Sequence, residues 1–103
     1  MSARAATKVA EPAAVERTAL APRWKVLIHD DPITTFEFVE TLLAQRFGKS
    51  ASEARRIARE THDTGVALVT VLPLETAEFK VEQAQSLARA AGFPLTFTLE
   101  PAD

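Results

Sequence analysis

Residues 66–72 limit the possible folds most strongly, because this stretch is almost continuously apolar and rich in β-branched side chains. Gly65 and Pro73 bound it closely, so it is too short for a buried helix and is typical of a strand. Pro73 cannot extend the ladder of that strand, but it can begin a helix. The run therefore predicts a central strand that is followed directly by a helix.

Two further segments alternate between inward and outward positions, as half-buried strands do. They are residues 24–29 and residues 95–100. In the first segment, Val26 and Ile28 share one face and His29 points the opposite way. In the second, Leu95 and Phe97 share a face.

Three segments have the three- and four-residue apolar spacing of a helix with one buried stripe. Thr34 and Ser50 each precede a Glu by three residues, which is the spacing of a capping box, so helices should begin just after them. Gly48, Gly65 and Gly92 supply the stops. The stripes are Phe36, Val39, Leu43 and Phe47, widened by Phe38 and Leu42; Ala54, Ile57, Ala58 and Thr61; and Ala77, Val81, Ala84, Ala88 and Ala91. The order predicts an α+β domain in which a three-stranded antiparallel sheet packs with three helices (β-α-α-β-α-β).

Composition narrows the possible partners. The chain has 103 residues, a net charge of −2 and no cysteine. These values indicate one domain, exclude disulfides and thiolate metal sites, and fit a cytoplasmic protein. No apolar run is long enough to cross a membrane. Arg55, Arg56 and Arg59 form a local basic cluster, but it has no interleaved aromatic residues, so we expect a solvated face and no nucleic-acid binding. The Ala-rich residues 1–22 should form a flexible N-terminal extension, with the domain at residues 23–103.

The junction between the first strand and the first helix contains the polar groups of greatest interest. Asp30 and Asp31 end the strand directly before Pro32, near the positive end of the following helix. Judged on its residues alone, this acidic pair is most simply a solvated turn. His62 alone would be a partner for the C-terminal dipole of its helix.

Several segments together resemble the ClpS family, the adaptors of the Clp ATP-dependent protease. The segments are residues 24–31, the Phe36-Glu37-Phe38-Val39 block, His62, residues 75–81 and residues 94–100. The resemblance implies an adaptor and not an enzyme, acting as a monomer without cofactor or metal. Such adaptors bind the free N-terminus of substrates with a bulky hydrophobic first residue, the N-degron. They deliver these substrates to a Clp AAA+ unfoldase by docking on its N-terminal domain.

The same resemblance assigns roles to individual residues. The α-amino group is an ammonium with three donors, so its site needs converging acceptors beside an apolar pocket. By resemblance the amino-group site comprises Asp30, Asp31 and His62, together with His29, which stands where the family usually has Asn. The hydrophobic pocket comprises Phe36, Val39, Ala58, Thr61 and Leu95. Glu75 and Lys80 are the candidates for docking the unfoldase.

Two departures from the family pattern lead to hypotheses. Phe36 stands where Met is usual and Ala58 where a larger apolar residue often occurs, so the pocket should favour aromatic over leucine N-termini. The loop that holds residues 32–35 is one residue longer than usual, and these positions receive no role. His29 and His62 can accept a bond only as neutral imidazoles, which usually gain a proton near pH 6.5, so affinity should weaken as pH falls.

Two alternatives remain at this stage. The first is a docking module of the same element order without a ligand pocket. The second is an enzyme in which the two histidines and a carboxylate hold a divalent metal. Neighbouring residues on a strand point to opposite faces, however, which argues against joint use of His29 and Asp30.

Overall fold

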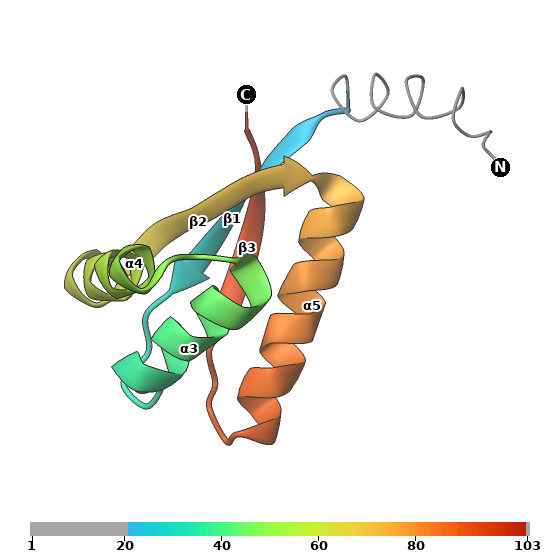
Figure 1. Cartoon of the computed structure of the whole chain (residues 1–103). Coiled ribbons are helices and arrows are strands. Elements are labelled where there is room, and N and C mark those ends of the chain that lie inside the picture. Colours follow the sequence, from blue (N-terminus) through green and yellow to red (C-terminus); the bar gives the residue numbers. More distant parts are fainter. Residues whose placement is uncertain (1–20, 103) are drawn as a thin grey trace, which may run out of the picture.

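The computed structural model describes residues 21–102 (Figure 1). Of the predicted extension at residues 1–22, residues 1–20 therefore lie outside the described part. The elements are β1 (Arg23–His29), α3 (Phe36–Phe47), α4 (Ala51–Thr64), β2 (Val66–Pro73), α5 (Leu74–Ala90) and β3 (Thr96–Pro101). The predicted order and the α+β class are confirmed.

The sheet is antiparallel throughout, with strand order β2-β1-β3. The prediction that residues 66–72 form a central strand was therefore wrong, because β2 lies at an edge and β1 in the middle. Within β2 only Ala67 and Val69 are buried, whereas Val66 and Leu68 are exposed. The apolar side chains on the open face made a half-buried edge strand resemble a fully buried one.

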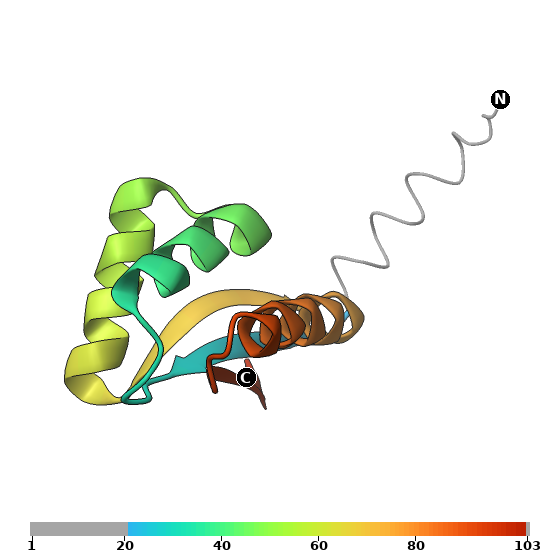
Figure 2. The same ribbon diagram turned by 90° about the horizontal axis from the view of Figure 1, so that it is seen from below.

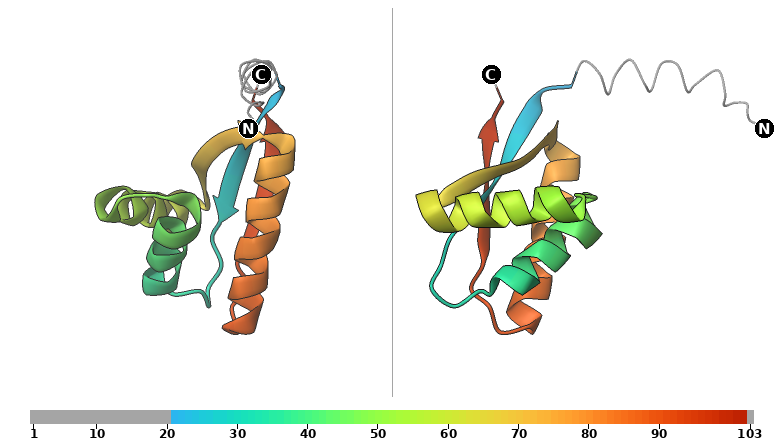
Figure 3. Two further views of the ribbon diagram at one scale, coloured as in Figure 1. Left: turned by 45° about the vertical axis from the view of Figure 1, so that its right-hand side comes forward. Right: turned by 60° about the vertical axis from the view of Figure 1, so that its left-hand side comes forward.

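All buried apolar side chains belong to one core that joins the sheet to the three helices. Val26 and Ile28 of β1 contribute from the sheet and are fully buried. In Figure 2, α3 and α4 lie together over one part of the sheet, while α5 lies beside them. Figure 3 shows α5 running along the strands, and this helix contacts all three of them. Its stripe of Ala77, Ala84 and Ala88 is fully buried, which allows this close approach.

The ends of the helices follow local capping chemistry, with one shift from the prediction. Ser50 caps α4 as expected, since its Oγ accepts from the Glu53 N–H at 3.1 Å. Helix α3 begins one residue later than predicted, because Thr35 and not Thr34 is its cap, with Oγ1 accepting from the Phe38 N–H at 3.1 Å. The third predicted stripe also ends early, since Ala91 is exposed beyond the end of α5.

Candidate functional site

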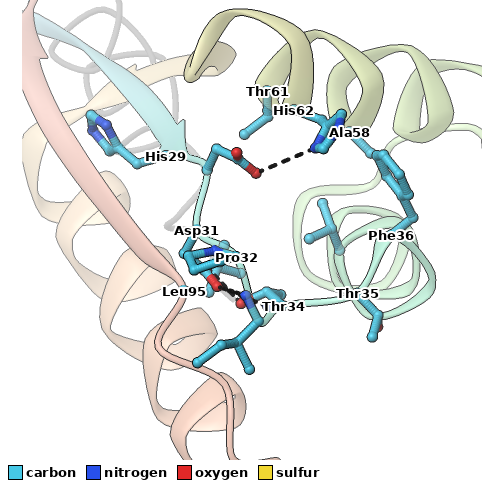
Figure 4. A pocket seen from close by; sticks show the side chains of 13 residues that line it. His29, Asp31, Pro32, Thr34, Thr35, Phe36, Ala58, Thr61, His62 and Leu95 are labelled. Carbon is cyan, nitrogen blue, oxygen red and sulfur yellow. Dashed lines mark hydrogen bonds and ion pairs between the residues drawn. The ribbon is translucent and has the colours of Figure 1, made fainter.

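A cavity of about 770 Å³ lies where the β1–α3 loop faces α4 and the segment before β3. Figure 4 shows the side chains around it. The structure brings together every residue predicted for the amino-group site and the hydrophobic pocket, and it adds the four loop residues that received no role. The lining residues are His29, Asp30, Asp31, Pro32, Ile33, Thr34, Thr35, Phe36, Val39, Ala58, Thr61, His62 and Leu95.

Asp30 and His62 approach each other at one side of this cavity. Asp30 Oδ1 and His62 Nδ1 are 3.9 Å apart, and the two side chains are 39% and 56% exposed. This distance is too long for a direct hydrogen bond, so both groups keep acceptor capacity for a donor placed near them. The backbone supports the arrangement, because the Asp30 N–H donates to the Gly65 carbonyl at 3.0 Å and so ties the loop to the end of α4.

Asp31 uses its carboxylate within its own loop. Its Oδ1 accepts from the backbone N–H groups of Ile33 and Thr34, each at 2.8 Å, and its Oδ2 accepts from the Thr34 hydroxyl at 2.6 Å. Burial raises the pKa of Asp31, but the Thr34 hydroxyl, the two backbone N–H groups and the charge of Arg89 outweigh it and lower the pKa below 3.8. Asp31 therefore fixes the loop through three hydrogen bonds to its carboxylate.

His29 borders the cavity, but its ring is turned away from the Asp30–His62 pair (Figure 4). Its Nε2 lies 2.7 Å from Thr98 Oγ1 on the neighbouring strand β3. The cause is strand alternation, since His29 is the last residue of β1 and points away from buried Ile28. The two imidazoles therefore lie apart in this structure, and His62 alone faces Asp30.

The apolar side of the cavity is formed mainly by buried residues. Val39, Ala58 and Leu95 come from α3, α4 and the segment before β3. Thr61 is also buried, and its hydroxyl donates to the Ile57 carbonyl at 2.7 Å, which satisfies its polarity. These residues leave a hollow with the polar pair on one side and hydrocarbon on the other.

Phe36 differs from these residues, because it is 41% exposed. Its ring meets the His62 ring edge-on at a centroid distance of 5.2 Å, and the Arg59 guanidinium carbon lies 5.2 Å from the Phe36 centroid. An aromatic ring held between an imidazole and a guanidinium is a stable wall for the cavity.

The loop residues that sequence reasoning left out also line the cavity. Ile33 is 59% exposed and follows Pro32 directly. A large apolar side chain in a polar turn was one available signal. The second was Thr34, which stands three residues after Asp31 in the spacing that lets an acidic side chain bond back to its own loop.

Glu75 and Lys80 lie outside the cavity, on α5. Glu75 is exposed in the first turn, whereas Lys80 Nζ donates to the Arg46 carbonyl at the end of α3 at 3.0 Å. They are five positions apart, which places them about 140° apart around the helix axis. Lys80 also joins α5 to the end of α3 through this bond, and the docking role of the two residues stays a prediction.

Among residues 21–102, no group of three or more His, Cys, Asp or Glu side chains is placed to hold a metal ion. None of the helices in this same part of the chain is long and apolar enough to cross a membrane. The cavity disfavours the alternative of a module without a ligand pocket.

Comparison with known proteins relates this chain to one family. Residues 19–98 match the family described as ATP-dependent Clp protease adaptor protein ClpS. The chain is 43% identical over 86 residues to the ClpS adapter protein of Desulfatibacillum aliphaticivorans, covering 84% of this chain and 83% of that one. It is 41% identical over 80 residues to the ClpS adapter of Lawsonia intracellularis, covering 78% and 73%.

A solved structure is also similar. It is Agrobacterium tumefaciens ClpS2 bound to L-phenylalaninamide, which superposes with a TM-score of 0.75 at 39% identity and covers 78% of this chain and 96% of that one. With an α+β fold, a cavity at the predicted loop and relatives of this similarity, the chain belongs to the ClpS family of Clp protease adaptors.

Proposed function

We propose that this adaptor binds the free N-terminus of substrates whose first residue is bulky and hydrophobic, and delivers them to a Clp AAA+ unfoldase. The observation that supports it most is the Asp30–His62 pair beside an apolar cavity. L-Phenylalaninamide, bound by the similar ClpS2, joins a free amino group to an aromatic side chain. Those are the two groups that such a cavity could receive.

The amino group would lie between Asp30 and His62. The carboxylate supplies charge and an acceptor, and neutral His62 supplies a second acceptor. Each charge-assisted hydrogen bond contributes roughly 1.5–3 kcal/mol. His29 and Asp31 act indirectly in this proposal, since Thr98 engages the His29 ring and the loop donates to the Asp31 carboxylate. Asp31 holds the loop in the binding geometry, and His29 secures the end of β1.

The side chain of the first residue would enter the hollow lined by Phe36, Val39, Ala58, Thr61 and Leu95. Burial of a large apolar side chain contributes about 1.5–3 kcal/mol. The small Ala58 leaves room on α4, and the exposed face of Phe36 can meet an aromatic ring. We therefore expect Phe- and Trp-initiated peptides to bind more tightly than Leu-initiated ones. Titration of the three peptides tests this, and tighter binding of the Leu peptide would reject it.

One pair of peptides tests the function itself. A Phe-initiated peptide should bind with micromolar affinity, and its N-acetylated twin should lose at least tenfold, because acetylation removes the charge but keeps the ring. Asp30→Asn and His62→Ala should each weaken binding of the free peptide and have little effect on binding of the acetylated one. Equal binding of the two peptides by the unmodified protein would reject recognition of the amino group.

Delivery needs a second surface, and we propose that Glu75 and the exposed residues around it on α5 dock the N-terminal domain of the unfoldase. Its support is that Glu75 is exposed and lies away from the cavity, so both partners can bind together. Lys80 would support this surface through its bond to Arg46. We further propose that the protein acts in the cytoplasm, as a monomer and without enzymatic activity of its own. Light scattering of the purified protein would test whether it is a monomer.

A further inference from the structure

A second hollow, of about 450 Å³, lies beside the first one. Phe36 is the residue that lines both hollows, so its ring separates them. The remaining lining residues of the second hollow are Glu40, Ser52, Arg55, Arg56 and Arg59. The arginine cluster that the sequence suggested to be a solvated face therefore surrounds a concave surface next to the binding cavity.

This second hollow is positively charged. Three guanidinium groups line it and only Glu40 opposes them. Arg56 approaches Glu60 at 3.3 Å and Arg59 approaches Asp63 at 3.9 Å, but all four side chains are about half or more exposed, so these pairs neutralise the arginines weakly. Within residues 21–102, Arg55 forms no ion pair. A carboxylate entering the hollow would find donors that are still available.

The two hollows are close enough for one short peptide to reach both. The Phe36 centroid lies 5.2 Å from the His62 ring and 5.2 Å from the Arg59 guanidinium carbon. The His62 ring and the Arg59 guanidinium carbon are therefore at most about twice that distance apart. An extended chain of three residues spans about 10 Å. A peptide with its first residue in the cavity can place the side chain of its second or third residue over the arginines.

We propose that this basic hollow receives an acidic side chain at the second or third position of the bound substrate. The chain thereby selects N-termini that combine a bulky hydrophobic first residue with Asp or Glu shortly after it. This inference rests on the proposed binding of free N-termini and adds to it the class of substrate. Arg55 is the main contact for the carboxylate, and Arg59 also keeps Phe36 in place as the wall between the two hollows.

The test uses three peptides that begin with Phe and differ only at positions two and three, and a fourth that differs from one of them only by N-acetylation. Glu-Glu, Gln-Gln and Lys-Lys peptides are compared, together with an N-acetylated Glu-Glu peptide. Because exposed ion pairs contribute little each, the Glu-Glu peptide should bind about two- to fivefold more tightly than the Gln-Gln peptide at low salt, and the Lys-Lys peptide more weakly than both. The difference should shrink as salt is added, since salt screens exposed charges.

Two variants locate the effect. Arg55→Gln should bring the ratio of the Glu-Glu and Gln-Gln affinities close to one. Arg23→Gln removes the same charge from the far end of β1, about 20 Å of strand away from His29, and should leave the ratio unchanged. Equal affinities of the Glu-Glu and Gln-Gln peptides for the unmodified protein would overturn the inference while leaving recognition of the amino group intact. The same would follow if Arg55→Gln and Arg23→Gln lowered the affinity ratio equally. Equal binding of the acetylated and free Glu-Glu peptides would overturn both.

Discussion

The two adjacent aspartates, Asp30 and Asp31, have different surroundings in this protein. Asp30 is exposed and faces His62 across the cavity, whereas Asp31 is bonded to Ile33 and Thr34 of its own loop. Alternation and the position of Pro32 place them in these two environments. The acidic pair in the sequence is thus one ligand-facing group and one loop-fixing group.

The lowered pKa of Asp31 makes a prediction about stability. A carboxyl group whose pKa is lower in the folded state stabilises the fold above its unfolded pKa, and this contribution is lost as pH falls through the folded value. Asp31→Ala should therefore lower the free energy of unfolding by about 1–3 kcal/mol at pH 7. Chemical denaturation across pH should show the gap between variant and parent closing below about pH 4, near the ordinary Asp pKa. A gap that stays constant down to pH 2 would contradict the assigned role.

His62 makes a prediction about binding. A neutral imidazole supplies an acceptor to the amino group, and an aliphatic side chain does not. His62→Leu should therefore weaken binding of a Phe-initiated peptide, and His62→Asn should weaken it less, because its amide keeps an acceptor. His29→Leu serves as the control, since the His29 ring bonds to Thr98 and is turned away from the Asp30–His62 pair. Calorimetric titration measures these affinities, and equal binding by His62→Leu and the unmodified protein would reject this role.

At the level of elements, most boundaries follow from capping and spacing. Gly48 and Gly65 end their helices with φ values of 66° and 95°, and Ser50 caps α4, as the sequence predicts. The start of α3 was missed because Thr34 and Thr35 are both good caps. The local bonds of Asp31 decide between them, since its carboxylate accepts from the Thr34 hydroxyl and leaves Thr35 to cap the helix.

The two threonines allow a matched comparison. Thr35→Ala removes the cap of α3 and should destabilise the protein by about 1 kcal/mol. Thr34→Ala removes the hydroxyl bond to Asp31 and should instead affect the loop, so that peptide affinity falls along with stability. Thermal unfolding and peptide titration of both variants separate the effects. Loss of peptide affinity in Thr35→Ala but not in Thr34→Ala would contradict the assignment of Thr35 to the helix and Thr34 to the loop.

For the whole molecule, the sequence predicts the element order and the location of the site, but not every direction in which a side chain points. The placement of β2 at an edge depends on long-range pairing that a seven-residue window does not contain. The orientation of the His29 ring depends on Thr98, which is 69 residues away in the chain. By contrast, the contributions of Val39, Ala58 and Leu95 to one cavity follow the family resemblance, because the fold that joins these segments is shared.

The whole molecule also makes a prediction about delivery. Glu75 on α5 and the cavity beneath the β1–α3 loop are separate surfaces, so Glu75→Lys should reduce unfoldase-dependent degradation of a Phe-initiated substrate without changing affinity for the peptide. Exposed Glu53→Lys, on α4, makes the same change of charge on another helix and is the control. A parallel loss of peptide affinity in Glu75→Lys would show that the two surfaces are not independent.

The bond from the Asp30 N–H to Gly65 and the three bonds to Asp31 have a kinetic consequence. Because they are made before any ligand arrives, no segment of the described loop has to order itself during an encounter, and the entropic cost of capture is reduced. Association rate constants should then be similar for substrates with different first residues. The adaptor would discriminate between substrates by their dissociation rates, and those that dissociate most slowly would most often be bound when the unfoldase engages.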